Sequence, residues 1–119
     1  MSQYMLLLYD DPAHWMNVGP EEMQKIIQKY VAWRQKLTDQ KLLVGSHKLM
    51  DEPGKVLRGK SQVRITDGPY SETKEVLGGY FLIEAPDYAA ACEQARSCPS
   101  LEYGGTIEVR EVDPMVPRK

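Results

Sequence analysis

Residues able to do acid–base or charge chemistry crowd into one segment, TDGPYSETKEVLGGY (66–80), between two strand-like apolar runs. Asp67, Lys74 and Glu75 supply two carboxylates and an ammonium, the groups that move protons or hold anionic substrates. A plain hairpin turns in about two to five residues, so this connection is longer than a turn requires. We take it as the first candidate catalytic segment.

Each of these residues also has a purely structural explanation. Asp67 can bond its own backbone, Gly68 supplies positive φ and Pro69 fixes the next φ, so the three together shape a turn. The functional alternative puts the Asp67 carboxylate at a strand end, facing a pocket as a base or hydrogen-bond acceptor. Lys74 and Glu75 fit a solvated loop face, or they point into a cleft between subunits, where Lys74 binds an anionic group and Glu75 moves a proton.

Further candidates would bind a ligand rather than react. Gly78 and Gly79 would let backbone approach a ligand or a neighbouring strand, or they form a β-bulge at the start of a strand. Tyr70 and Trp15 offer aromatic surface, and core packing explains Trp15 less well because it lies in a loop rich in Pro, Asn and Gly. Arg58 is either solvent-exposed or clamps a carboxylate.

The two histidines, His14 and His47, lie far apart in the sequence. A lone histidine in a loop or strand is more often a surface or satisfied polar residue than a catalyst. If His47 meets Asp67, however, the carboxylate would orient the imidazole and raise its basicity, which suits proton shuttling beside a carbonyl. No two-His-one-carboxylate spacing stands out, and nothing in the sequence indicates a metal or an organic cofactor.

The elements that must position these residues follow a regular order. Short apolar or alternating runs predict strands at 4–9, 42–49, 55–59, 62–66, 79–85 and 105–112. Helical spacing of apolar residues predicts helices at 20–40, with Pro20 in its first turn, and at 88–97, capped by Asp87. The order is the βαββαβ plan of a ferredoxin-like α+β domain with an extra hairpin in the middle.

The same patterns predict which side chains face inward. The inner positions are Met23, Ile26, Ile27, Tyr30, Trp33 and Leu37 on the first helix, Tyr88, Ala91, Cys92 and Ala95 on the second, and Val63 and Ile65 on the hairpin. Two helices cover only one face of a four-stranded sheet, yet YMLLLY and YFLI are apolar on both faces. A large bare apolar face is rare in monomers, so we expect a homodimer packed sheet to sheet around a two-fold axis.

Composition narrows the class of protein. With 119 residues, we expect one domain spanning 1–119. Fifteen basic and seventeen acidic residues give a charge of −2, which indicates neither nucleic acid nor membrane as a partner. The first apolar run is too short to span a membrane and lacks the basic start of a signal peptide. Cys92 and Cys98 have no zinc-ligand spacing, so we expect a cytoplasmic protein with reduced thiols.

Several strings together resemble a known family. YMLLLYDD, TDGPYSETKEVLGGYFLIEAPD and YGGTIEVREV resemble the YCII-related family in its DGPF subgroup, with Tyr70 where the subgroup usually has Phe. The resemblance implies a dimeric α/β barrel. It implies little about activity, because the subgroup has no well-established reaction and some members are found beside extracytoplasmic-function sigma factors. Related YCII proteins have been proposed to use a His–Asp pair in a cleft, and neither His14 nor His47 falls on an alignable motif position.

These observations leave two functional hypotheses of different classes. The first is a small-molecule enzyme that transfers protons on a carbonyl-containing or anionic metabolite, in a cleft near the dimer interface lined by Asp67, Tyr70, Lys74 and Glu75. The second is a non-catalytic ligand-binding or regulatory module, with a link to sigma-factor-dependent transcription. In a third and simpler case, the 66–80 segment mainly builds the dimer.

Overall fold

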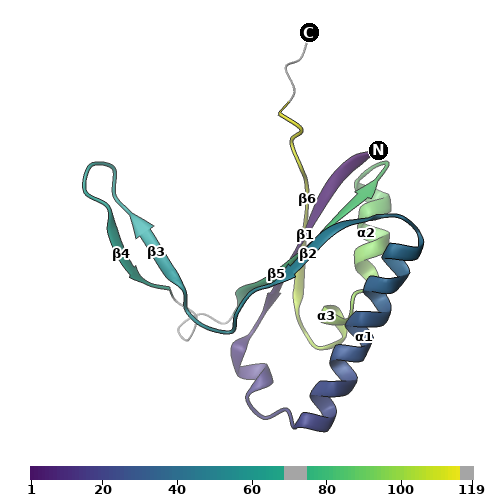
Figure 1. Cartoon of the computed structure of the whole chain (residues 1–119), viewed down its shortest axis with the longest axis horizontal. Helices are drawn as coiled ribbons and strands as arrows, with labels where there is room; N and C mark the ends of the chain where they lie inside the picture. The colour runs from purple at the N-terminus through teal and green to yellow at the C-terminus, as the bar shows by residue number, and fades with distance from the viewer. Residues whose placement is uncertain (69–74, 116–119) are drawn as a thin grey trace.

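The computed structural model describes residues 1–68 and 75–115 (Figure 1). The strands are β1 (Ser2–Asp10), β2 (Leu43–Lys48), β3 (Lys55–Arg58), β4 (Arg64–Asp67), β5 (Val76–Ala85) and β6 (Thr106–Glu111). The helices are the 3₁₀ turn η1 (Pro12–Trp15), α1 (Pro20–Asp39), α2 (Tyr88–Arg96) and the single turn α3 (Pro99–Glu102). Both expected long helices and all expected strands are present, whereas η1 and α3 were not predicted.

Four strands form one antiparallel sheet in the order β2-β5-β1-β6. The strands that are first and third in the basic βαββαβ plan, β1 and β5, lie at its centre, as a ferredoxin-like topology requires. The remaining strands, β3 and β4, pair only with one another as a separate hairpin. The expected α+β fold with an extra hairpin is therefore confirmed.

The core lies between the sheet and the helices, which share one side of the sheet (Figure 1). Leu6 on β1, Ile83 on β5 and Leu37 on α1 are completely buried there. The Trp33 and Phe81 rings meet edge to face, with their centroids 4.6 Å apart, an arrangement favoured by the quadrupoles of the two rings. This packing fixes α1 against the sheet and so fixes one wall of the cleft described below.

The inward face of α1 is narrower than its apolar stripe. Ile26, Trp33 and Leu37 are buried, as expected, but Ile27 is 48% exposed. Successive helical residues point about 100° apart, so Ile27 cannot share the line that Ile26 makes with the sheet. The expectation that Ile27 is a core residue was wrong.

The inward face of α2 is narrower still. Ala91 and Ala95, one turn apart, are buried as expected. Cys92 is exposed, and Tyr88 is 48% exposed although its ring packs on the edge of Tyr4. Those two core predictions were wrong, because a helix of nine residues lying on a sheet buries only one line of small side chains.

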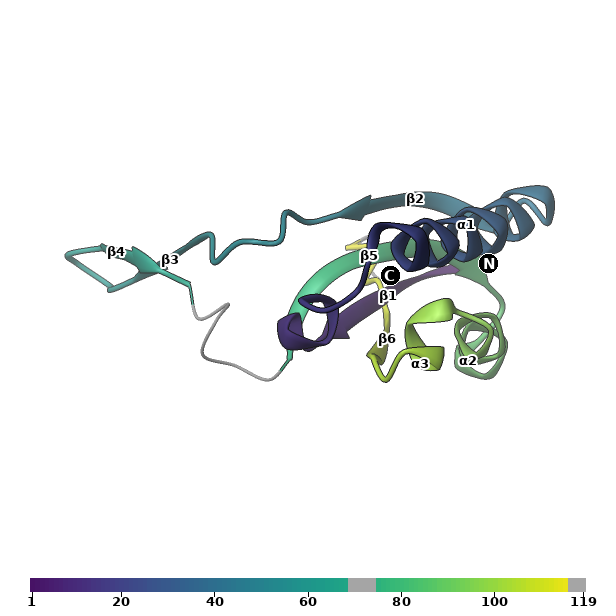
Figure 2. The same cartoon turned by 90° about the horizontal axis from the view of Figure 1, so that it is seen from below.

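The hairpin of residues 55–67, which we call the arm, extends away from the rest of the protein, which we call the body (Figures 1 and 2). In the register of the arm, Leu57 lies opposite Ile65. Val63 and Ile65 were expected to face inward, but they are 59% and 64% exposed. That prediction was wrong for a single chain, because the arm projects beyond the surface of its own body.

The outer face of the four-stranded sheet carries apolar side chains in register. Leu7 lies opposite Tyr80, and Met5 lies opposite Leu82. These positions alternate with the buried ones on both strands, so they point away from the helices. All four are only partly buried in the single chain. The expected second apolar face is present.

Candidate functional site: a cleft between the first long helix and the sheet

A cleft of about 500 Å³ opens between the first half of α1 and the β2–β5 end of the sheet, beside η1. Most of its lining is apolar: Leu8, Pro12, Trp15, Met23, Ile26, Ile27, Val31, Met50, Val76, Leu77 and Phe81. The polar lining is small: Asp10, Tyr30, Arg34, Ser46, His47, Lys48, Asp51 and Tyr80. An apolar concavity with a few polar groups is the usual form of a small-molecule site.

Asp10, the last residue of β1, contributes the most distinctive polar group. Burial raises the pKa of its carboxyl above the ordinary value. The positive charges of His14 and Lys48 oppose that rise, and the negative charges of Asp51 and Glu75 add to it. A carboxyl whose pKa is raised by desolvation in a cleft is a candidate acid–base group.

Gly105 makes room for this carboxyl, and its neighbour Gly104 lies beside His14. A Cβ on Gly105 would lie 2.7 Å from Asp10 Oδ1 and 2.9 Å from the Ser100 carbonyl oxygen. A Cβ on Gly104 would lie 3.6 Å from His14 Nε2, and Gly104 has a φ of +83°, which favours glycine. Asp10 and His14 therefore both lie against the turn before β6.

The 3₁₀ turn η1 holds His14 and Trp15 in place. Asp11 Oδ1 accepts a hydrogen bond from the Ala13 N–H at 2.9 Å and so caps the turn. The Trp15 ring packs against Tyr103, with ring centroids 5.9 Å apart. The placement of His14 near Asp10 is thus a consequence of a capped and anchored turn.

Tyr30 adds a protonated hydroxyl to the cleft wall. Its oxygen lies 2.6 Å from Ser100 Oγ, and burial raises its pKa to about 12. Burial also raises the pKa of the neighbouring Cys98 thiol. At neutral pH the phenol and the thiol keep their protons, so Asp10 is the group with raised pKa that is able to accept one.

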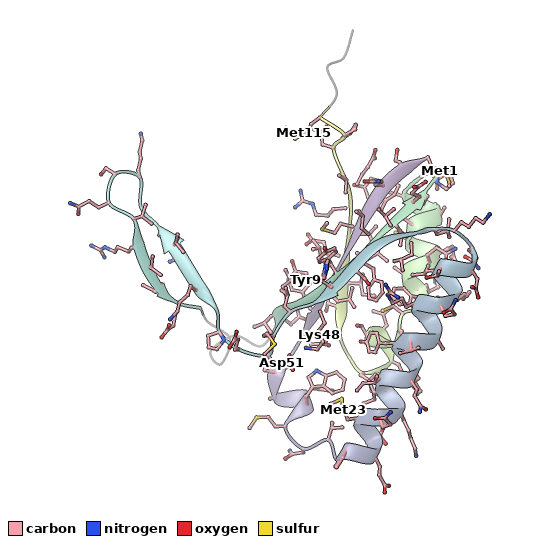
Figure 3. The ribbon with its side chains drawn as sticks, viewed as in Figure 1. Met1, Tyr9, Met23, Lys48, Asp51 and Met115 are labelled. Atoms are coloured by element: carbon pink, nitrogen blue, oxygen red, sulfur yellow. The ribbon has the colours of Figure 1, made fainter. Side chains whose placement is uncertain are left out.

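The cationic side chains lie toward the cleft rim. Lys48 Nζ is 2.8 Å from Asp51 Oδ1 in an exposed ion pair, and both lie at the foot of the arm (Figure 3). Arg34 donates its Nε–H to Ser46 Oγ at 3.1 Å. This bond holds the planar guanidinium beside Ser46, and a guanidinium suits a carboxylate or phosphate.

The structure brings some of the sequence-predicted site residues together. Four of them line the cleft: Trp15, His47, Gly78 and Gly79. The side chain of His47, however, lies on the outer face of the sheet with that of Tyr80, its partner across the strands, and His47 Nδ1 is 2.7 Å from the Tyr80 hydroxyl. Asp67, the partner considered for His47, has a different neighbour: its Oδ1 is 2.5 Å from Lys55 Nζ on the arm.

The other candidates lie elsewhere. Arg58 is on the arm, outside the cleft lining. Glu75 Oε1 accepts a hydrogen bond from Thr106 Oγ1 at 2.7 Å, which ties the start of β5 to β6. Tyr70 and Lys74 lie outside the described residues.

The two glycines of β5 have distinct structural roles. Leu8 pairs with Gly79 and Tyr9 pairs with Leu77, so Gly78 is the extra residue of a β-bulge. A Cβ on Gly79 would lie 2.8 Å from the His47 carbonyl oxygen, so β2 and β5 approach each other closely there. The bulge at Gly78 and the close approach of strands at Gly79 are both among the structural alternatives that the sequence offered for these glycines.

Sequence reasoning missed Asp10 as a site residue. The signals available were the spacing of Asp10 and His14 around a proline and the diglycine at 104–105. Each signal was ambiguous alone, because two acids and a proline after an apolar run are equally typical of a strand end.

Within 1–68 and 75–115, no helix is long and apolar enough to cross a membrane, and no cluster of His, Cys, Asp and Glu has the geometry to hold a metal ion. The sheet order, the helices on one face and the cleft define an α+β protein of ferredoxin-like topology. A family model for the YCII-related domain matches residues 2–116. The chain belongs to the YCII-related domain family. No curated protein matches it.

Proposed function

We propose that this protein is a small-molecule enzyme that transfers protons in the cleft, with Asp10 as the acid–base group. One observation carries the proposal: the Asp10 carboxyl lies in a largely apolar cleft, and burial raises its pKa. A carboxylate that is a stronger base than that of an ordinary aspartate is suited to removing a proton next to a carbonyl. The same group, once protonated, would return the proton to another atom.

The lining indicates the substrate class. Apolar side chains from η1 and α1, such as Trp15, Met23 and Ile27, would hold an apolar substrate body. The guanidinium of Arg34 would bind an anionic group at the rim. We therefore propose a carbonyl-containing metabolite with one acidic group and a short apolar portion, sized to about 500 Å³.

We also propose that the protein is a homodimer formed through the outer sheet face. Met5, Leu7, Tyr80 and Leu82 support this interface, because they form an apolar band on the side of the sheet opposite the helices. Burying such a band in a two-fold contact would remove apolar surface from water.

The sequence supports three finer assignments. We propose the DGPF subgroup, on the basis of TDGPYSETKEVLGGY, and a single domain over 1–119. The free thiols of Cys92 and Cys98 are consistent with a cytoplasmic location.

One observation favours the non-catalytic alternative. Asp67, the acid expected to react, is exposed and ion-paired with Lys55 on the arm. If the cleft binds a ligand without turning it over, we propose instead a ligand-binding module, and the resemblance to the DGPF subgroup then suggests a regulatory role linked to sigma-factor-dependent transcription.

The experiment that separates these functions uses Asp10→Asn and the matched control Asp11→Asn. Asparagine keeps the size of each side chain, and at position 11 it also keeps the cap of η1. Small keto acids and related carbonyl compounds are incubated with each protein in D₂O, and exchange of the α-proton is followed by ¹H NMR. We expect the wild type to catalyse this exchange. The exchange rate should fall by about 10²–10⁴-fold in the Asp10 variant and stay at the wild-type level in the Asp11 variant. Binding without exchange in the wild type would favour the regulatory module.

A further inference from the structure

One face of the arm is mostly apolar, although the ion pair of Lys55 and Asp67 also lies on it at the base of the arm, and the opposite face carries Val56 with Arg58, Arg64 and Thr66. Leu57 and Ile65 lie directly opposite each other, and Val63 shares their face because side chains alternate along a strand. These three side chains are between 59% and 64% exposed. Apolar and polar residues alternate along residues 63–66, and such alternation is typical of a strand with one buried face. The described residues of the body do not cover that face.

A hairpin with this structure is poorly supported by its own contacts. An isolated two-stranded hairpin is marginally stable in water. On the face opposite Leu57 and Ile65, Arg58 lies directly opposite Arg64, and like charges opposite each other destabilise a strand pair. The ion pair of Lys55 and Asp67 is largely exposed, so it adds little stability. Apolar cover and nearby acids would both stabilise the arm.

The charge of the chain is divided between arm and body in a complementary way. Residues 55–67 contain four basic residues and one acid, whereas the rest of the chain contains eleven basic and sixteen acidic residues. The arm therefore carries +3 and the remainder −5. A basic arm fits an acidic body, and projection from its own body leaves the body of another copy as the complementary surface (Figure 2).

We propose that the arm of each subunit crosses to a second copy of this chain and packs its Leu57, Val63 and Ile65 face against the body of that copy. The proposal rests on the dimer proposed above, and it adds an interface that a contact between two sheets does not need. The strands of the body on either side of the arm in the sequence end at Lys48 and begin at Val76, and both residues line the cleft. Exchange of arms would therefore couple the cleft rim of each subunit to dimer formation.

The test compares two charge-neutral double variants by analytical ultracentrifugation. Leu57→Asn with Ile65→Asn removes apolar surface from the proposed contact face. Ser61→Asn with Thr66→Asn is the matched control, because these residues lie at the tip and on the other face of the arm. We expect the first pair to raise the dimer dissociation constant at least ~30-fold, and the second to leave it within about threefold.

A photo-cross-linking amino acid at position 57, in a mixture of isotopically heavy and light chains, locates the contact directly. We expect cross-links between heavy and light chains, and none from a control position at Lys25. An unchanged dissociation constant for the Leu57 and Ile65 variant, or cross-links within one chain only, would overturn the arm exchange while leaving the sheet dimer standing. A wild type that stays monomeric at all concentrations would overturn both.

Discussion

The cleft and the arm both carry apolar side chains, but they differ in how much of the surrounding chain supports those side chains. The apolar walls of the cleft come from elements held by a common core, in which Leu6, Leu37 and Ile83 are inaccessible to water. The apolar side chains of the arm, such as Leu57 and Ile65, are more than half exposed. The walls of the cleft are therefore supported within a single chain, whereas the apolar face of the arm is uncovered there. We expect substitutions in the two regions to act on different equilibria.

The largest difference between the regions should appear in folding stability. Leu6→Ala removes a fully buried side chain from the core and should cost about 2–5 kcal/mol in the free energy of unfolding. Leu57→Ala on the arm should cost less than about 0.5 kcal/mol. Both values are measured by urea unfolding at a concentration where the protein is monomeric. Equal losses would mean that the arm is part of the single-chain core.

The glycine beside Asp10 gives a smaller effect within the body. Gly105→Ala would place a Cβ 2.7 Å from Asp10 Oδ1 and 2.9 Å from the Ser100 carbonyl oxygen. Because one of those neighbours is backbone, we expect a loss of about 1–3 kcal/mol in the free energy of unfolding. Gly45→Ala is the matched control, since a Cβ there meets nothing within 4 Å. Similar losses at both positions would show that the space around Asp10 is not constrained.

Hydrogen exchange distinguishes the regions by their dependence on concentration. Amides of β1, at the centre of the sheet, should be protected at every protein concentration. Amides of β3 and β4 should exchange at least ~10-fold more slowly at dimeric than at monomeric concentrations, because the partner covers them. Mass spectrometry at two protein concentrations measures both sets in one sample. If hydrogen exchange of the β3 and β4 amides did not depend on protein concentration, the proposed difference between the arm and the body would be contradicted.

The smallest effect concerns the pH dependence of stability. The native pKa of Asp10 is raised, so between its unfolded and native pKa values the native state binds more protons than the unfolded state. Stability therefore falls as pH rises through that window. Asp10→Asn should remove this fall and be slightly more stable than wild type at neutral pH. The midpoints of urea unfolding of both proteins, measured from pH 3 to 8, test whether stability falls as pH rises. An Asp10→Asn variant that is less stable than wild type at neutral pH would contradict this prediction.

Local signals in the sequence predicted most of the fold. The expected cap at Asp87 is present: its Oδ1 accepts a hydrogen bond from the Ala90 N–H at 2.8 Å. Pro20 begins α1, as predicted. Alternation also identified Val63 and Ile65 as one face of a hairpin. The alternation could not show whether the same chain or another molecule covers that face, because it indicates only that one face of the hairpin is apolar.

The site was harder to predict because it depends on contacts that are distant in the sequence. Asp10 becomes unusual only when Gly105, at the start of β6, leaves space for its carboxyl. Similarly, His47 meets Tyr80 through the pairing of β2 with β5. The crowded charges of the 66–80 segment attracted attention, yet Asp67 lies on the exposed arm. Local density of charged residues does not identify a desolvated group.

The central claim is that the cleft holds a carboxyl group tuned for proton transfer. The most direct test is a ¹³C NMR titration of the Asp10 side-chain carboxyl, assigned by its loss in Asp10→Asn. We expect the pKa of Asp10 to lie clearly above 3.8, the ordinary value for an aspartate. A pKa at or below that value would show that Asp10 is a well-solvated or salt-bridged carboxylate, and it would contradict the proposed role of the cleft.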